Sequence, residues 1–196
     1  MKRKTLTLCE CAVLVALSFV LSLVKIPLPF GGSVTLCSMV PLVIAAQRNG
    51  AGWGFFSAGV FSVIKLLLGL ENFSYVSGAV SFVCVLLFDY LLAYTAVGIS
   101  GFFRPTESDT KSSLCARAGL GAFVGMVFRY ACHVVSGAAV WYDLTKAWEA
   151  DDATNMVFRY GKWMYSLVYN GIYMLPETVI TVAAVIAVSA FTAKRK

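Results

Sequence analysis

This sequence has few charged residues and almost no histidine. Of its 196 residues only 13% are charged, one is a histidine and 59% are hydrophobic, with a mean hydropathy of +0.79. An average soluble domain is roughly 45–50% apolar and about 25% charged. The composition therefore excludes an ordinary soluble domain and predicts an integral membrane protein, with residues 1–196 forming one transmembrane domain.

The sequence also lacks the motifs of several kinds of catalytic site. It has no G-x-x-x-x-G-K-[ST] phosphate-binding loop, so it does not hydrolyse ATP by that route. It has no H-E-x-x-H motif or Cys/His cluster, and of its six scattered cysteines Cys9 and Cys11 form only a C-x-C. We therefore expect no metal, no cofactor and no enzymatic activity, and we favour ligand binding over chemistry.

The net charge of +6 does not indicate a nucleic-acid partner. The lysines and arginines lie at both ends of the chain and in short loops beside apolar runs, instead of on one basic face. Basic residues in such places face membrane lipid and concentrate on the cytoplasmic side. Their distribution predicts that both termini are cytoplasmic, which requires an even number of spans.

Six apolar stretches are candidate membrane spans, since a helix needs ~20 residues to cross a bilayer. They cover residues 5–26, 36–47, 53–70, 75–103, 114–141 and 163–191. The second is short and contains Pro41, so we expect it to be irregular or partly buried. The prediction is an all-α bundle of six transmembrane helices, in a multi-pass protein of the bacterial plasma membrane.

Two aromatic residues outside the spans are candidate ligand or lid residues. Phe30 lies in PLPFGGSVTL, residues 27–36, a loop with many prolines and glycines that is too apolar for a solvated linker. We expect this loop to fold back on the protein as a lid. Trp148 lies in the long acidic loop after the fifth span.

The fifth span carries four notable side chains at four-residue intervals. Arg129, His133, Gly137 and Trp141 lie on one slowly drifting stripe of an α-helix, and such a stripe can line a ligand pocket. A purely structural role also fits: the imidazole can hydrogen-bond a neighbouring helix, the glycine can permit close packing, and the indole can anchor at the membrane surface.

The sixth span favours the pocket interpretation. In GKWMYSLVYNGIYMLPET, Trp163, Asn170 and Glu177 recur at seven-residue spacing and share one face, with Tyr165 nearby. Two polar faces on neighbouring spans can enclose a site between them.

Asp89 is the strongest single indication of a site. It lies near the middle of the fourth span, beside Tyr90, where a carboxylate costs ~2.5–3.5 kcal/mol and almost always faces a cavity or a partner. Its partner is either a ligand or Arg129 of the fifth span. Aromatic faces with one carboxylate suit a flat cationic heteroaromatic ligand, since each ring attracts a cation by ~0.5–2 kcal/mol. Asn170 and tyrosine hydroxyls can read ring nitrogens and a hydroxyl.

At these residues the sequence resembles the thiamine-specific substrate-binding subunits of energy-coupling factor transporters. The resemblance spans nearly the whole chain and is clearest in GGSVTLCSMVPLVIAAQRNG, FDYLLAYTAVG, CHVVSGAAVW and YSLVYNGIYMLPE. It implies a six-helix substrate-binding domain that takes thiamine from outside. It also implies partners, namely a transmembrane coupling subunit and two ATPase subunits.

The resemblance implies thiamine contacts at Asp89, Tyr90, His133, Gly137, Trp141, Tyr165 and Asn170. The family usually has a glutamate where this chain has Asp89, which is one methylene shorter. Some relatives have a tryptophan in the first outer loop, where this chain offers Phe30. The family's paired alanines that meet the coupling subunit match Ala12 and Ala16, although such a pair also fits packing within the chain.

Two other functions are compatible with the sequence. The bundle and the alanine pair would serve equally in a subunit for a different vitamin, because only the pocket differs. A small membrane enzyme that uses Asp89, His133 and Glu177 as acid and base is the alternative of another class.

Overall fold

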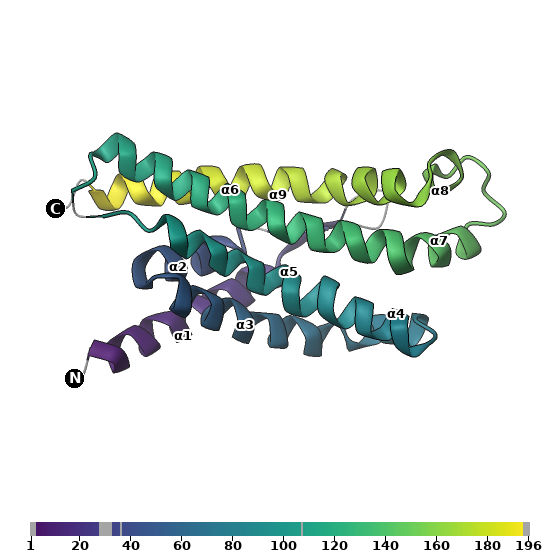
Figure 1. The fold of residues 1–196 in the computed structure, drawn as a ribbon, viewed down its shortest axis with the longest axis horizontal. Coiled ribbons are helices and arrows are strands. Elements are labelled where there is room, and N and C mark those ends of the chain that lie inside the picture. The colour runs from purple at the N-terminus through teal and green to yellow at the C-terminus, as the bar shows by residue number, and fades with distance from the viewer. Residues whose placement is uncertain (1–2, 28–32, 36, 107, 194–196) are drawn as a thin grey trace.

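The structure is a computed structural model that describes residues 3–27, 33–35, 37–106 and 108–193. It is built from helices, apart from one short hairpin (Figure 1). The helices that are not part of a longer composite helix are α1 (Arg3–Leu23), α2 (Val40–Asn49), α3 (Ala51–Leu68), the 3₁₀-helix η1 (Leu70–Tyr75), α8 (Met156–Arg159) and α9 (Lys162–Ala193). The all-α class predicted from the sequence is confirmed.

Two further long helices change type along their length. The first consists of α4 (Ala79–Cys84), the π-helix η2 (Val85–Leu91), α5 (Leu92–Thr95) and the 3₁₀-helix η3 (Ala96–Phe103). The second consists of α6 (Lys111–Ser136), the π-helix η4 (Gly137–Trp141) and α7 (Tyr142–Trp148). The second helix therefore extends beyond the predicted fifth span, into residues that the sequence analysis assigned to an outer loop.

Five helices of the described residues are long and apolar enough to cross a membrane, where the sequence predicted six. They cover Lys4–Leu23, Ala51–Leu68, Ala79–Phe103, Lys111–Trp148 and Lys162–Thr192. The predicted second span is the exception, because α2 has only ten residues and a length of about 15 Å, half of a bilayer core. Its Leu42, Val43 and Ala45 are fully buried, so α2 packs inside the bundle and does not face lipid.

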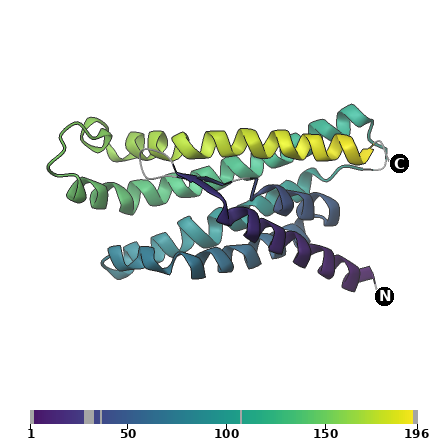
Figure 2. The same cartoon turned by 180° about the vertical axis from the view of Figure 1, so that it is seen from behind.

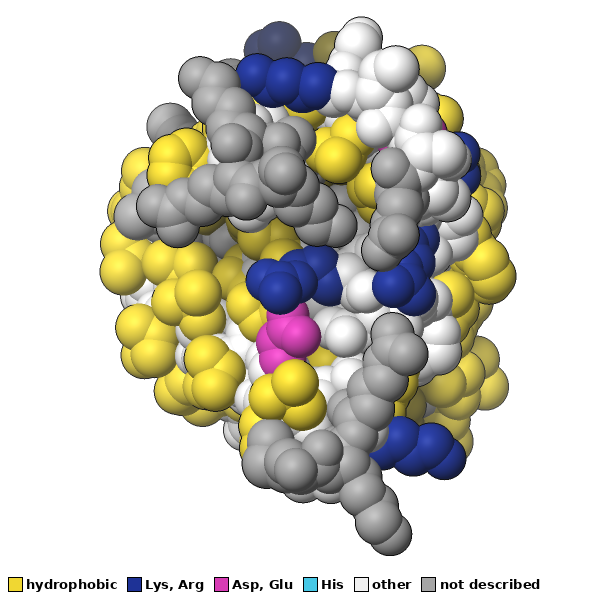
Figure 3. Space-filling model, turned by 90° about the vertical axis from the view of Figure 1, so that its left-hand side faces the viewer, with side chains coloured by type: hydrophobic (Ala, Val, Ile, Leu, Met, Phe, Trp, Pro, Cys, Tyr) yellow, Lys and Arg dark blue, Asp and Glu magenta, His cyan; other side chains and the backbone are white. Residues whose placement is uncertain are grey.

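The start of α1 and the end of α9 lie at the same end of the molecule (Figure 1). The C-terminal turn of α2 is also at this end, where Arg48 Nε lies 2.9 Å from Glu10 Oε1 of α1. Figure 3 shows this end with several separate groups of Lys and Arg side chains, and hydrophobic side chains around them. The opposite end is formed by α4, α7 and α8.

A two-stranded hairpin follows α1. Strands β1 (Lys25–Pro27) and β2 (Ser33–Thr35) pair antiparallel, with Lys25 opposite Thr35. β1, in dark purple in Figure 2, runs from the end of α1 toward α9. The predicted first span therefore ends earlier than expected, at Leu23. Phe30 and the centre of the predicted lid, residues 28–32, lie outside the described residues.

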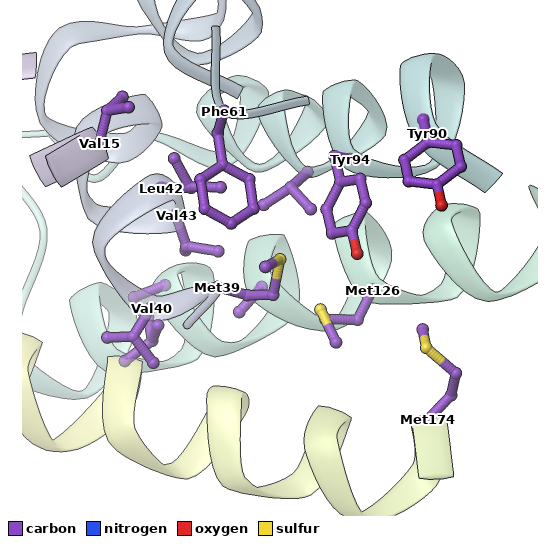
Figure 4. Close-up of a cluster of buried hydrophobic side chains, with 14 of the residues drawn as sticks. Val15, Met39, Val40, Leu42, Val43, Phe61, Tyr90, Tyr94, Met126 and Met174 are labelled. Atoms are coloured by element: carbon purple, nitrogen blue, oxygen red, sulfur yellow. The ribbon is translucent and has the colours of Figure 1, made fainter. Parts of the chain in front are cut away.

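The hydrophobic core is formed by side chains of α1, α2, α3, the two composite helices and α9. Figure 4 shows Phe61 of α3, Met126 of α6 and Met174 of α9 in this core, with Tyr90 and Tyr94 at one edge. Glycine allows the helices to approach here: a Cβ on Gly121 would lie 2.8 Å from the Cβ of Phe103. The packed core supports one wall of the cavity described next.

Candidate ligand-binding cavity

A cavity of about 460 Å³ lies between the hairpin, the end of α3, η2, α5, the second composite helix and α9. Cavities of roughly 300–1,000 Å³ are usual for small-molecule sites. Every predicted ligand residue that the structure describes lines it: Asp89, Tyr90, His133, Gly137, Trp141, Trp148, Tyr165 and Asn170. The structure thus brings together residues that are far apart in the sequence.

The carboxylate of Asp89 is held by three side chains of the facing helix. Ser136 Oγ and Trp141 Nε1 donate to Oδ2 at 2.7 and 2.6 Å, and His133 Nδ1 lies 3.2 Å from Oδ1. Neutral donors of this kind stabilise a carboxylate without cancelling its charge. Asp89 therefore offers a negative charge at a fixed place in the cavity wall.

The hydrogen bond to Asp89 sets the tautomer of His133. Because a carboxylate only accepts, Nδ1 carries a proton, and in the neutral imidazole Nε2 is then an acceptor. Within the described part of the chain Nε2 is buried and has no hydrogen-bond partner. Since His133 lines the cavity, a ligand that donates an N–H or O–H group can satisfy this nitrogen.

Both helices change to π-helical geometry where they form the site. η2 contains Asp89 and Tyr90, and η4 begins at Gly137 and ends at Trp141. Side chains four residues apart on an α-helix drift by roughly 40° around the axis, and the wider π turn reduces that drift. This explains why the whole stripe from Arg129 to Trp141 lines the cavity.

Arg129 does not pair with Asp89, so that alternative is wrong. Its Nη1 lies 2.8 Å from Glu177 Oε2, and both side chains are almost completely buried. Thr35 of β2 donates to Glu177 Oε1 at 2.5 Å, and the guanidinium lies 4.9 Å from the ring centre of Tyr94. The ion pair therefore joins α6, α9 and the hairpin, and leaves Asp89 free for a ligand.

Asn170 contacts the cavity but also holds α9 against α6. Its Nδ2 donates to Ser166 O at 2.9 Å and to His133 O at 3.3 Å, and its Oδ1 accepts a short hydrogen bond from Tyr173. The amide is thus engaged on both sides within the protein. Its role in shaping the wall was not part of the sequence prediction.

α9 comes very close to the second composite helix at Gly137. A Cβ there would lie 2.2 Å from Ser166 Oγ and 2.9 Å from Asn170 Nδ2. Since Ser166 donates to Val134 O at 2.7 Å, its hydroxyl cannot move away without losing a buried hydrogen bond. The prediction that this glycine permits close packing is confirmed.

We expect Gly137→Ala to lower the free energy of unfolding by about 1–3 kcal/mol, the usual cost of overpacking. Thermal unfolding of the ligand-free protein in detergent would measure the change. Gly161→Ala is the matched control, because a Cβ on Gly161 would meet nothing within 4 Å. Equal melting temperatures for the two variants would contradict the packing role of Gly137.

Tyr90 is held in place from outside the predicted site. Its hydroxyl accepts from Asn72 Nδ2 at 2.7 Å and donates to Gly69 O at 3.1 Å. A Cβ on Gly69 would lie 2.1 Å from that hydroxyl, so only glycine fits there. Figure 4 shows that Tyr90 and Tyr94 extend in the same direction from their helix.

The sequence analysis missed three tyrosines that line the cavity, Tyr94, Tyr169 and Tyr173. The last two follow the predicted Tyr165 at four-residue intervals, and neighbouring rings in this row lie 5.6 and 6.1 Å apart, so helical spacing was a usable signal. Trp163, by contrast, is 55% exposed and does not line the cavity.

A second cavity of about 500 Å³ is an apolar groove on the outer surface of α1 and α3. Ala12 and Ala16 line it, together with side chains such as Phe19, Phe56 and Val60. Both alanines are exposed, so this pair does not mediate close packing within the described part of the chain. The groove therefore lies on an outward face of two apolar helices of span length.

Comparisons with known proteins agree with these observations. Residues 8–196 match a family model described as "Thiamine transporter protein". The chain is 32% identical to thiamine transporter ThiT of Bacillus subtilis, over 98% of this chain and 94% of that protein. It is 26% identical to ThiT of Lacticaseibacillus paracasei, over 93% and 86%. A solved structure of ThiT from Listeria monocytogenes has a similar fold, with a TM-score of 0.73 at 22% identity and 98% of each chain covered.

Proposed function

The chain belongs to the thiamine transporter protein family, a family of transporters and not of enzymes, and we propose that it is the thiamine-binding subunit of an energy-coupling factor transporter. As a multi-pass plasma-membrane protein it would capture thiamine from outside as a single substrate-binding domain. A transmembrane coupling subunit and two ATPase subunits would then drive uptake. Thiamine is the substrate, and no cofactor is required.

The observation that carries the proposal is the charge of Asp89 in an aromatic cavity. Thiamine has a permanently cationic thiazolium ring, and Asp89 offers a carboxylate whose Oδ2 accepts from two neutral donors, Ser136 and Trp141. Trp141 and Tyr94 line the same cavity and can face a cationic ring. A neutral vitamin would gain nothing from a carboxylate held in this way.

The remaining polar atoms suit the aminopyrimidine ring of thiamine. Nε2 of His133 is a buried acceptor without a protein partner among the described residues, and the exocyclic amine of the pyrimidine is a donor. Tyr165 and Tyr90 can add ring contacts, and Asn170 holds its neighbours in position. Phe30 and Trp148 would cover the ligand from the loop and from α7.

The orientation and the partner follow from the two ends of the bundle and the groove. The end with the termini carries separate groups of Lys and Arg, which favours the cytoplasm (Figure 3). The cavity is then reached from the outer side. The apolar groove with Ala12 and Ala16 supports a lateral contact with the coupling subunit within the membrane.

Titration of the purified protein tests the proposed ligand. Thiamine should quench tryptophan fluorescence through Trp141, and mass spectrometry of the purified protein should find thiamine unmodified. Riboflavin or biotin in its place would support a subunit for a different vitamin. A chemically converted ligand would support the enzyme alternative, although Glu177, one of its three proposed groups, is paired with Arg129.

The alanine groove provides a separate prediction about coupling. Ala16→Leu fills a surface that must approach a partner closely, and overpacking costs about 1–3 kcal/mol, or roughly five- to a hundredfold in assembly. Uptake by the full complex should fall by that factor, while thiamine affinity of the isolated subunit stays unchanged. Leu17→Ala, an exposed position outside the groove, is the control. Loss of binding together with uptake would contradict the coupling role.

A further inference from the structure

We propose that Lys65 and Lys25 form an anion subsite in the ligand cavity, which takes the phosphate group of a thiamine phosphomonoester. This inference rests on the proposed function, because it extends the thiamine site to a phosphorylated form of the same ligand. Both lysines line the cavity, from the last turn of α3 and from β1.

The two lysines are cations without an acidic partner. Among the described residues no carboxylate lies within 4 Å of either ammonium, and Glu71, which also lines the cavity, forms no ion pair with them. The third cation of the wall, Arg129, is already neutralised by Glu177. Lys65 is half-buried in the last turn of the span-length helix α3, so its ammonium loses part of its hydration without gaining a counter-ion, which costs free energy. An anionic ligand group at this place removes that cost.

The two kinds of charge occupy different parts of the cavity. Lys65 interacts electrostatically with Lys25, Arg129 and Glu177. Asp89 instead contacts His133, Ser136 and Trp141, which lie along α6 and η4 beyond Arg129. His133, Ser136 and Trp141 lie roughly 6, 10 and 18 Å along the helix axis from Arg129. The cavity therefore has a negative part at Asp89 and a positive part beside the hairpin.

A phosphomonoester of thiamine has the matching distribution of charge. Its thiazolium ring is a fixed cation, and the phosphate at the end of its short side chain carries about −1.5 to −2 at neutral pH. With the ring beside Asp89, the side chain can extend toward Lys65. Unphosphorylated thiamine would leave the two ammonium groups facing a neutral hydroxyl.

The test compares three ligands on variants of single lysines. Lys65→Met keeps much of the apolar stem and removes the charge, and Lys162→Met removes a charge from an exposed position at the start of α9 that does not line the cavity. Calorimetric titrations would measure the affinity of each protein for thiamine, thiamine monophosphate and inorganic phosphate. Thermal unfolding of each variant shows that it remains folded, and Lys65→Gln serves if the methionine variant does not.

We expect Lys65→Met to weaken thiamine monophosphate roughly ten- to a hundredfold, the usual range for a charge-assisted contact. The affinity for thiamine should stay the same or rise, because a repelling cation is gone, and Lys162→Met should change neither ligand. Lys25→Met should show a smaller loss, since Lys25 is exposed.

Three results would overturn the subsite. Equal changes for thiamine and its monophosphate on Lys65→Met would mean that Lys65 acts only on the fold. An unchanged affinity for the monophosphate would mean that its phosphate lies elsewhere. Tight binding of inorganic phosphate at Lys65, without competition from thiamine monophosphate, would assign the lysines to a free anion. Failure of thiamine itself to bind the unaltered protein would instead disprove the proposed function.

Discussion

Glu177→Gln should lower the free energy of unfolding by about 3–5 kcal/mol, the usual cost of removing one partner of a buried ion pair. Arg129 would be left as a buried cation, since its Nη1 lies 2.8 Å from the Glu177 carboxylate and the side chains are only 6% and 2% exposed. Its Nε already lacks a hydrogen-bond partner among the described residues. Denaturant and thermal unfolding of the ligand-free protein in detergent would measure the loss.

A double variant distinguishes the stability lost with the ion pair from the stability lost through altered packing. Replacing both partners, as in Arg129→Met with Glu177→Leu, leaves no unpaired charge and should recover most of the stability lost in Glu177→Gln. Thr35→Val should cost less, because it removes only the hydroxyl donor to Oε1. If the double variant is less stable than Glu177→Gln, burial of the unpaired arginine is not the cause of the loss.

The same ion pair shows where prediction from sequence reached its limit. Asp89 was recognised as unusual at membrane depth, and Arg129 and Glu177 were placed on polar helix faces, but spacing along a helix does not tell which of the three side chains face each other. The sequence analysis allowed Asp89 to pair with Arg129, whereas the Arg129 guanidinium pairs with Glu177 of α9. Pairing between helices depends on their relative rotation, which no single helix encodes.

The sequence brought the candidate ligand residues to one cavity wall because most of them lie on helices with a clear polar stripe, and their contact with a ligand stays a prediction. The stripe from Arg129 to Trp141 faces the cavity, and Asp89 meets it from the opposite helix. The two π-helical segments were not predicted, since the choice between i→i+4 and i→i+5 bonding depends on packing against neighbours.

Only five of the six predicted spans are span-length helices in the described residues, and the reason is related. Residues 36–47 are apolar enough for a span, but apolar composition alone does not distinguish contact with lipid from contact with protein. Here α2 is ten residues long and buried by the helices around it. The hairpin before it was also missed, because residues 25–27 and 33–35 are too few for a periodic pattern.

Asp89→Asn should weaken thiamine by about 1.5–3 kcal/mol, or roughly ten- to a hundredfold, because it removes the charge that faces the thiazolium ring and keeps the shape. A thiamine analogue with a neutral aromatic ring in place of the thiazolium should lose much less on the same change. Calorimetric titration of both ligands would measure the two losses. Equal losses would contradict the role of Asp89 as a counter-ion.

The structure also predicts how the ligand-free protein responds to this change. An asparagine has one acceptor oxygen instead of two, so it cannot accept from Ser136, Trp141 and His133 as Asp89 does. A modest fall in melting temperature is therefore expected, much smaller than that of Glu177→Gln, because no buried charge loses its partner. Because Arg129 pairs with Glu177 and not with Asp89, only Glu177→Gln should leave a buried cation without a partner. If Asp89 were itself part of a structural ion pair, its neutralisation would destabilise the protein as strongly as that of Glu177.

Asp89 has a shorter side chain than the glutamate that the family usually has. Asp89→Glu adds one methylene to a side chain whose oxygens already lie 2.6 and 2.7 Å from two donors of the facing helix. The longer side chain must either give up those donors or extend into the space of the ligand, so we expect weaker thiamine binding than in the unaltered protein. A gain in affinity would show instead that the aspartate reaches the ligand less well than the glutamate that the family usually has.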